Sequence, residues 1–120
     1  MSNLQQVKRP LTKVKPETCE EKLNRMVDSY AEDLSSENSK QSGYDFLYKH
    51  GYSIRYIVDS DLTYRAAEIL VAGGGPNIWV CTDTNTVEGY WGSDKVTSGY
   101  TDNIGLDEAC EEEYNAKKGA

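Results

Sequence analysis

Apolar residues recur at three- and four-residue spacing between residues 19 and 34. This period predicts an amphipathic helix. Thr18 and Glu21 have the spacing of a capping box, and Glu17 and Glu20 add negative charge where the helix dipole favours it. The helix therefore begins at about residue 19. Its predicted apolar stripe consists of Cys19, Leu23, Met26, Val27, Tyr30, Ala31 and Leu34.

A polar, serine-rich segment over residues 35–42 predicts a loop before a second, shorter helix. Tyr44 to Tyr48 supplies the apolar side chains of this helix, and Gly51 marks its end. His50, the only histidine, lies beside that glycine, where it can interact with the helix dipole. A catalytic role for His50 would require the fold to bring one of the three cysteines within hydrogen-bonding reach.

The pattern then changes to the two-residue period of β-strands. Four segments predict strands: 52–58, 64–72, 78–81 and 87–91. In the second of these, Ala66, Ala67 and Glu68 are also compatible with a helix, and we favour the strand. Polar residues 82–86 suit a hairpin loop, and Gly89 inside the last strand indicates a bulge or a close backbone approach. Because side chains alternate along a strand, Glu88 and Tyr90 are expected on one sheet face and Gly89 and Trp91 on the other.

A polar loop is predicted over residues 93–105, followed by a C-terminal helix. The apolar side of that helix comprises Leu106, Ala109, Cys110 and Tyr114. Consecutive strands favour antiparallel neighbours. We therefore predict an α+β fold, in which an antiparallel four-stranded meander packs against two N-terminal helices and one C-terminal helix. Residues 16–120 form this single domain, and residues 1–15 form a flexible basic tail.

Charge is distributed unevenly along the 120 residues. The net charge is -7, but the first 15 residues contain four basic side chains and no acidic one, so the remainder carries -7 - 4 = -11. Such a body repels nucleic-acid phosphate and attracts basic surfaces. We expect a basic protein as partner and no direct binding of nucleic acid by the body.

The three cysteines cannot all pair within one chain, and the N-terminus lacks the apolar run of a secretory signal. A reducing, cytoplasmic compartment is expected. The longest apolar run, from Ile69 to Ala72, is much shorter than the roughly 20 residues that cross a bilayer. No membrane association is therefore expected, and the oligomeric state stays open.

Two segments carry a family resemblance: ILVAGGGPNIWV over residues 69–80 and VEGYWGSD over residues 87–94. They resemble short acidic proteins of unknown function from phages and mobile elements of Gram-positive bacteria. The similarity extends from about Tyr52 to Tyr114 and implies no particular reaction. It implies a setting in the host-cell cytoplasm, because accessory genes of such elements often encode small acidic inhibitors of host defence, including anti-restriction and anti-CRISPR proteins.

Catalytic and metal-binding patterns are weak. The glycine run at residues 73–75 lacks both the dinucleotide fingerprint and the Walker lysine, and no cysteine pair has zinc-ligand spacing. Asp83, Glu88 and Asp94 surround the predicted hairpin, where they form a solvated surface, act as an acid and base pair, or bind a divalent metal. We favour the solvated surface and predict no catalytic residue, cofactor or metal.

The leading hypothesis is a non-enzymatic acidic module that occupies the basic nucleic-acid-binding surface of a host defence nuclease. Trp79 is expected in the core, whereas Trp91 and Tyr100 are candidate exposed anchors or core-edge residues. The alternatives are a small carboxylate-dependent enzyme acting on nucleotides or nucleic acid, and a structural or regulatory subunit of the mobile element. The candidate partner-binding residues are Asp83, Glu88, Trp91, Asp94, Tyr100, Glu108, Glu111 and Glu112.

Overall fold

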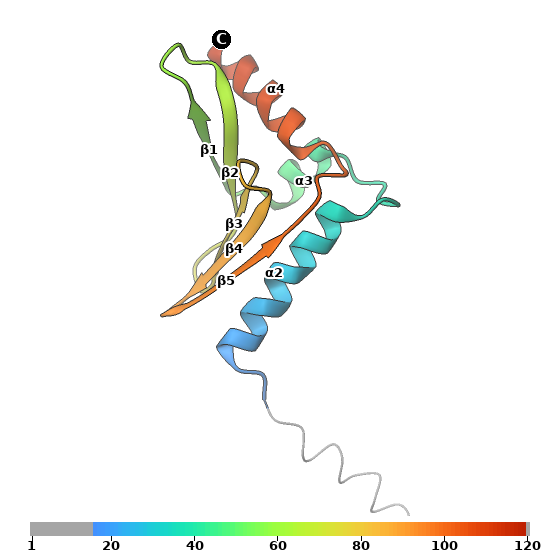
Figure 1. The fold of residues 1–120 in the computed structure, drawn as a ribbon, viewed down its shortest axis with the longest axis vertical. Coiled ribbons are helices and arrows are strands. Elements are labelled where there is room, and N and C mark those ends of the chain that lie inside the picture. Colours follow the sequence, from blue (N-terminus) through green and yellow to red (C-terminus); the bar gives the residue numbers. More distant parts are fainter. Residues whose placement is uncertain (1–15, 120) are drawn as a thin grey trace, which may run out of the picture.

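A computed structural model describes residues 16–119 of the chain, so the predicted tail over residues 1–15 lies outside the described residues. Five antiparallel strands form one sheet, and three helices lie on one of its faces (Figure 1). The strands follow one another in chain order, as the meander prediction requires. The elements are α2 (Cys19–Ser35), α3 (Gly43–His50), β1 (Ser53–Val58), β2 (Tyr64–Ala72), β3 (Asn77–Cys81), β4 (Thr86–Trp91), β5 (Asp94–Gly99) and α4 (Leu106–Lys118).

The α+β class and the antiparallel order are confirmed, but the strand number is wrong. Residues 94–99 form β5 rather than a loop. They pair with β4, with Asp94 opposite Trp91 at one end and Gly99 opposite Thr86 at the other. The strand was missed because it lies at the sheet edge and is mostly polar. Its sequence signal is the two-residue connection Gly92-Ser93, where Gly92 has a φ of 61°.

Both N-terminal helices begin at side-chain caps, and the cap at Thr18 was predicted from the sequence. The Thr18 side chain accepts a hydrogen bond from the Glu21 backbone nitrogen, and Glu21 accepts one from Thr18 in return. Ser42 and Asp45 repeat this capping box at α3. The α2 stripe is buried as predicted at Leu23, Val27, Ala31 and Leu34, but Cys19 is exposed because it precedes the part of α2 that packs on the sheet.

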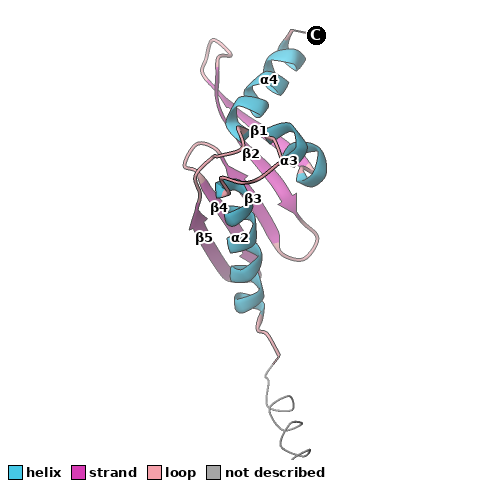
Figure 2. Cartoon of the chain, turned by 90° about the vertical axis from the view of Figure 1, so that its right-hand side faces the viewer, coloured by secondary structure: helices cyan, strands magenta, loops and turns pink. Residues whose placement is uncertain are grey.

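The core lies between the sheet and the helical layer, which faces the viewer in Figure 2. The α2 helix packs on β4 and β5, while α4 packs on β2 and on α3. Gly89 is the point of closest approach, because a Cβ atom there would lie 2.6 Å from Val27 Cγ2 and 2.8 Å from Leu23 Cδ1. The predicted close backbone approach at Gly89 is therefore confirmed.

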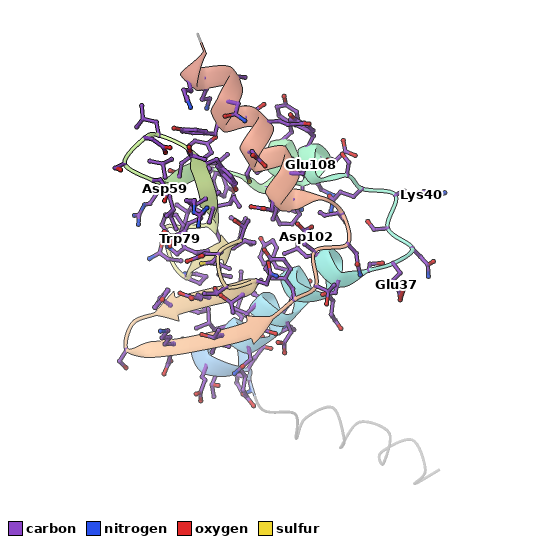
Figure 3. All side chains as sticks on the ribbon, turned by 45° about the horizontal axis from the view of Figure 1, so that its top comes forward. Glu37, Lys40, Asp59, Trp79, Asp102 and Glu108 are labelled. Carbon is purple, nitrogen blue, oxygen red and sulfur yellow. The ribbon has the colours of Figure 1, made fainter. Side chains whose placement is uncertain are left out.

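The start of α4 is fixed by a residue outside the helix. The Asp102 carboxylate accepts hydrogen bonds from the backbone nitrogens of Leu106 at 2.8 Å and Asp107 at 3.0 Å. Gly105, at the N-cap position, has a left-handed φ of 77° and makes no side-chain cap. Nearby, the Gly43 nitrogen donates to the Ile104 carbonyl at 2.8 Å, which joins the starts of α3 and α4. Figure 3 shows Asp102 and Glu108 at this junction.

Within residues 16–119, no helix combines the length and the apolar character needed to cross a membrane.

Candidate functional site

The structure does not gather the eight predicted partner-binding residues on one surface. Asp83 lies in the exposed β3–β4 turn and Asp94 is half-buried beyond the opposite end of β4. Glu88 lies between them on β4, on the sheet face opposite to that of Gly89, which packs against α2. These three carboxylates therefore do not come together as an acid and base pair. Glu108, Glu111 and Glu112 project from α4 and are exposed, as predicted from its apolar stripe.

Neither predicted aromatic anchor is freely exposed. Tyr100 is only 8% exposed, and its hydroxyl donates to the Cys81 carbonyl at 3.3 Å, so its prediction as an exposed anchor is wrong. Burial raises the pKa of this hydroxyl. Trp91 is half-buried against the core, with the Lys22 ammonium 5.5 Å from its ring. Both residues lie on the side of the sheet that the helices cover.

Acidic side chains concentrate in the helical layer. The α2 and α4 helices each contain five acidic and two basic residues. The five strands together contain three acidic and three basic residues, and are therefore balanced. The two layers consequently differ in net charge, and the excess negative charge of the helices and strands lies on the helical side.

Few of these carboxylates are neutralised by the chain itself. Among residues 16–119, only Glu17, Asp59 and Glu68 form ion pairs with arginine. The side chains of Glu108 and Glu111 have no hydrogen bond or ion pair among the described residues, whereas Glu112 accepts a hydrogen bond from the Tyr44 hydroxyl at 2.7 Å. That bond raises the pKa of Tyr44 to about 12. Glu108 and Glu111 are therefore exposed carboxylates without a contact of this kind in residues 16–119.

The open sheet face contains a second feature, a shallow pocket of about 280 Å³. Alternation along β3 directs Ile78 and Val80 into the core and leaves Trp79 half-exposed on the open face, so the prediction that Trp79 belongs to the core is wrong. Figure 3 shows its position on the sheet. Three central strands and the edge strand β1 supply the pocket lining, which comprises Arg55, Glu68, Trp79, Cys81, Glu88 and Tyr90.

Glu88 and Tyr90 lie on the same face, as their alternation predicted, and are bonded to each other. The Tyr90 hydroxyl donates to Glu88 at 2.7 Å, and the Thr86 hydroxyl donates to the other carboxylate oxygen at 3.4 Å. The bond to Glu88 raises the pKa of Tyr90 to about 12. Arg55 and Glu68 were missed in the sequence, because they join this site only through the register of β1, β2 and β3.

His50 and the cysteines do not form a nucleophilic site in the described residues. His50 ends α3 as predicted, but its ring packs against Tyr30 and Phe46, and burial lowers its pKa. Burial also raises the pKa of Cys81 to about 11 and that of Cys110 to about 12. Neither buried thiol is therefore activated as a nucleophile at neutral pH.

Thiol reactivity provides a direct check on this arrangement. In the native protein at pH 8 we expect the exposed Cys19 to react rapidly with a disulfide reagent, and the buried Cys81 and Cys110 to react only after unfolding. Colorimetric titration should give one fast thiol per chain, and three in denaturant. Cys19→Ser should abolish the fast phase. A fast phase that persists in this variant would show that a buried cysteine opens readily to solvent.

Metal-ligating side chains do not converge either: residues 16–119 contain no group of three or more His, Cys, Asp or Glu side chains able to hold an ion together. The open-face pocket and the acidic outer surface of α4 are thus the two candidate sites. No family model, curated protein or solved structure matches this chain.

Proposed function

We propose that this chain is a non-enzymatic binding module that recognises a basic surface on another protein. The observation that carries the proposal is the one-sided charge of the fold. The helical layer is acidic and most of its carboxylates lack a cationic partner within residues 16–119, whereas the strands are balanced. A field of this kind steers a positively charged partner toward one side of the molecule.

The acidic surface of α4 supplies the first contacts in this proposal. Glu108 and Glu111 are exposed and unpaired among the described residues, so they stand in for nucleic-acid phosphates on a basic channel. The nature of the partner is a finer proposal: a nucleic-acid-binding protein of host defence, inhibited by occupation of its channel. This step is supported by the resemblance to phage and mobile-element proteins and by the charge, and it requires no cofactor.

Charge reversal on α4 tests the proposal. The partner would be captured from the natural host, purified, and its association rate measured for the parent and for Glu108→Lys/Glu111→Lys. We expect the rate to fall about tenfold at low salt, and the difference to shrink as salt rises, because long-range steering is screened over about 10 Å at 0.1 M. Glu112 is kept because it bonds Tyr44.

A matched control is Glu37→Lys/Asp83→Lys. It changes the net charge equally at two exposed positions outside the helices and strands. Figure 3 shows Glu37 on the loop that projects between α2 and α3. Equal slowing by both variants would contradict a role for the α4 surface, and unchanged binding by both would contradict recognition by charge. Repeating the assay with a chelator separates this proposal from the alternative of a metal-dependent enzyme.

A further inference from the structure

The open-face pocket combines carboxylates with aromatic rings, which is the chemistry that recognises an organic cation. Trp79 and Tyr90 present ring surfaces, and Glu68 and Glu88 present oxygen acceptors within the same 280 Å³. A pocket of this size lies near the lower limit for small-molecule sites, which start at about 300 Å³. It therefore suits one side chain or a similarly small group rather than a large cofactor.

Glu88 is the pocket carboxylate that forms no ion pair among the described residues. It is half-buried, and its hydrogen-bond partners among the described residues are the neutral hydroxyls of Tyr90 and Thr86. Residues 16–119 provide it with no ion pair. The Tyr90 hydroxyl, 2.7 Å away, holds the carboxylate in place. Glu88 is thus an oriented acceptor with which neither Arg55 in the lining nor Lys95 above the Tyr90 ring forms an ion pair.

Arg55, which lines the pocket, shows that a guanidinium group fits against its aromatic and carboxylate side chains. Its guanidinium carbon lies 4.2 Å from the centroid of the Trp79 ring, and its Nη1 lies 3.9 Å from Glu68 Oε1. Both contacts are weakly held, since the Arg55 side chain remains 67% exposed and the ion pair is long. Arg55 lies on the edge strand β1, where it can swing into solvent and leave the indole face free.

We propose that the pocket binds an arginine side chain of the partner protein, which displaces Arg55 from Trp79 and pairs with Glu88. This inference rests on the proposed function, because it assumes a basic partner, but it places a specific contact on the opposite side of the sheet from α4. Arginine is preferred to lysine because its planar group can stack on the indole while its donors bond a carboxylate bidentately.

The pocket can be tested without the natural partner, using N-acetyl-arginine amide as the probe. Nuclear magnetic resonance would follow the indole N–H of Trp79, assigned with a Trp91→Phe variant. We expect a saturable shift in the parent and binding about threefold to fivefold tighter in Arg55→Ala, because the competing stack is removed. Glu88→Gln should weaken binding about tenfold, since a charge-assisted hydrogen bond is lost.

Arg65→Ala is the matched control for Arg55→Ala. It removes an equally exposed arginine that pairs with Asp59 on an adjoining segment and does not line the pocket. The indole signal of Trp91 reports whether each variant stays folded. The same amide of lysine should bind at least about threefold more weakly than that of arginine.

Three outcomes would overturn the pocket proposal: no saturable shift at Trp79 in Arg55→Ala, equal binding of the two amides, or equal tightening by Arg65→Ala. These outcomes are independent of the test on α4. If the amide binds as expected and the α4 variants do not alter partner association, the pocket proposal stands while electrostatic recognition by the helical layer fails.

Discussion

Gly89→Ala is expected to lower the free energy of unfolding by about 2 to 3 kcal/mol, near the upper end of the usual cost of overpacking a core. The added methyl group would lie 2.6 Å from Val27 Cγ2 and 2.8 Å from Leu23 Cδ1, both in buried side chains of α2. These atoms cannot move aside without shifting α2 away from β4. Urea unfolding followed by tryptophan fluorescence would measure the loss.

Two further variants identify the cause of this loss. Gly75→Ala adds the same methyl group where nothing lies within 4 Å, so it should change stability by no more than about 0.5 kcal/mol. Val27→Ala combined with Gly89→Ala should cost less than the sum of the single changes, because the first removes the nearer of the two atoms that the added methyl group would strike. Strict additivity would mean that the helix does not press on Gly89.

Gly43→Ala is expected to cost about 3 kcal/mol, although alanine favours an isolated helix over glycine by about 1 kcal/mol. A Cβ atom at residue 43 would collide with the Gly105 carbonyl and approach the Leu106 Cα to 2.9 Å. Both neighbours are backbone atoms, so relief requires moving the starts of α3 and α4 apart. The Gly43 hydrogen bond to Ile104 would then be strained or broken.

Gly99→Ala provides a control in which the methyl group makes an ordinary contact, 3.9 Å from the Asn85 carbonyl. The free energies of unfolding of both variants would be measured by thermal and urea unfolding. An unchanged m-value would show that Gly43→Ala lowers stability by a local collision and not by a general loss of packing. Equal stability of Gly43→Ala and the parent would show that the α3–α4 junction is looser than its backbone contacts indicate.

Local signals account for the parts of the fold that sequence predicted well. The cap at Thr18 and the alternation in β1 and β4 depend on residues a few positions apart, so a local pattern in the sequence is enough to predict them. The edge strand β5 lacks such a pattern, because Val96 alone brings a large apolar side chain to the core. The β5 strand is stabilised by its hydrogen bonds to β4, and the amino-acid composition of a segment does not show which strand it will pair with.

The candidate sites also differ in whether neighbouring residues or strand pairing determine them. Exposure of the α4 glutamates follows from one helical stripe, and was predicted. The pocket requires Trp79 opposite Glu88 and Glu68 opposite Cys81, which is fixed only when three strands adopt one register. The burial of Tyr100 was not predicted, because residues 93–105 were expected to form a loop. In the structure Tyr100 directly follows β5, and its side chain lies in the core.

The packing of α2 against β4 and β5 also constrains the order of events during synthesis. Its apolar stripe leaves the ribosome before the strands that cover Leu23 and Val27, because β4 and β5 come later in the chain. At the usual elongation rate of about 5 to 20 residues per second, several seconds pass before β5 is available. During that interval Tyr30 can already contact Phe46 and His50 of α3, but the part of α2 that carries Leu23 and Val27 lacks its native cover. This apolar surface, rather than the finished sheet, is then the part of the fold that is open to non-native contacts.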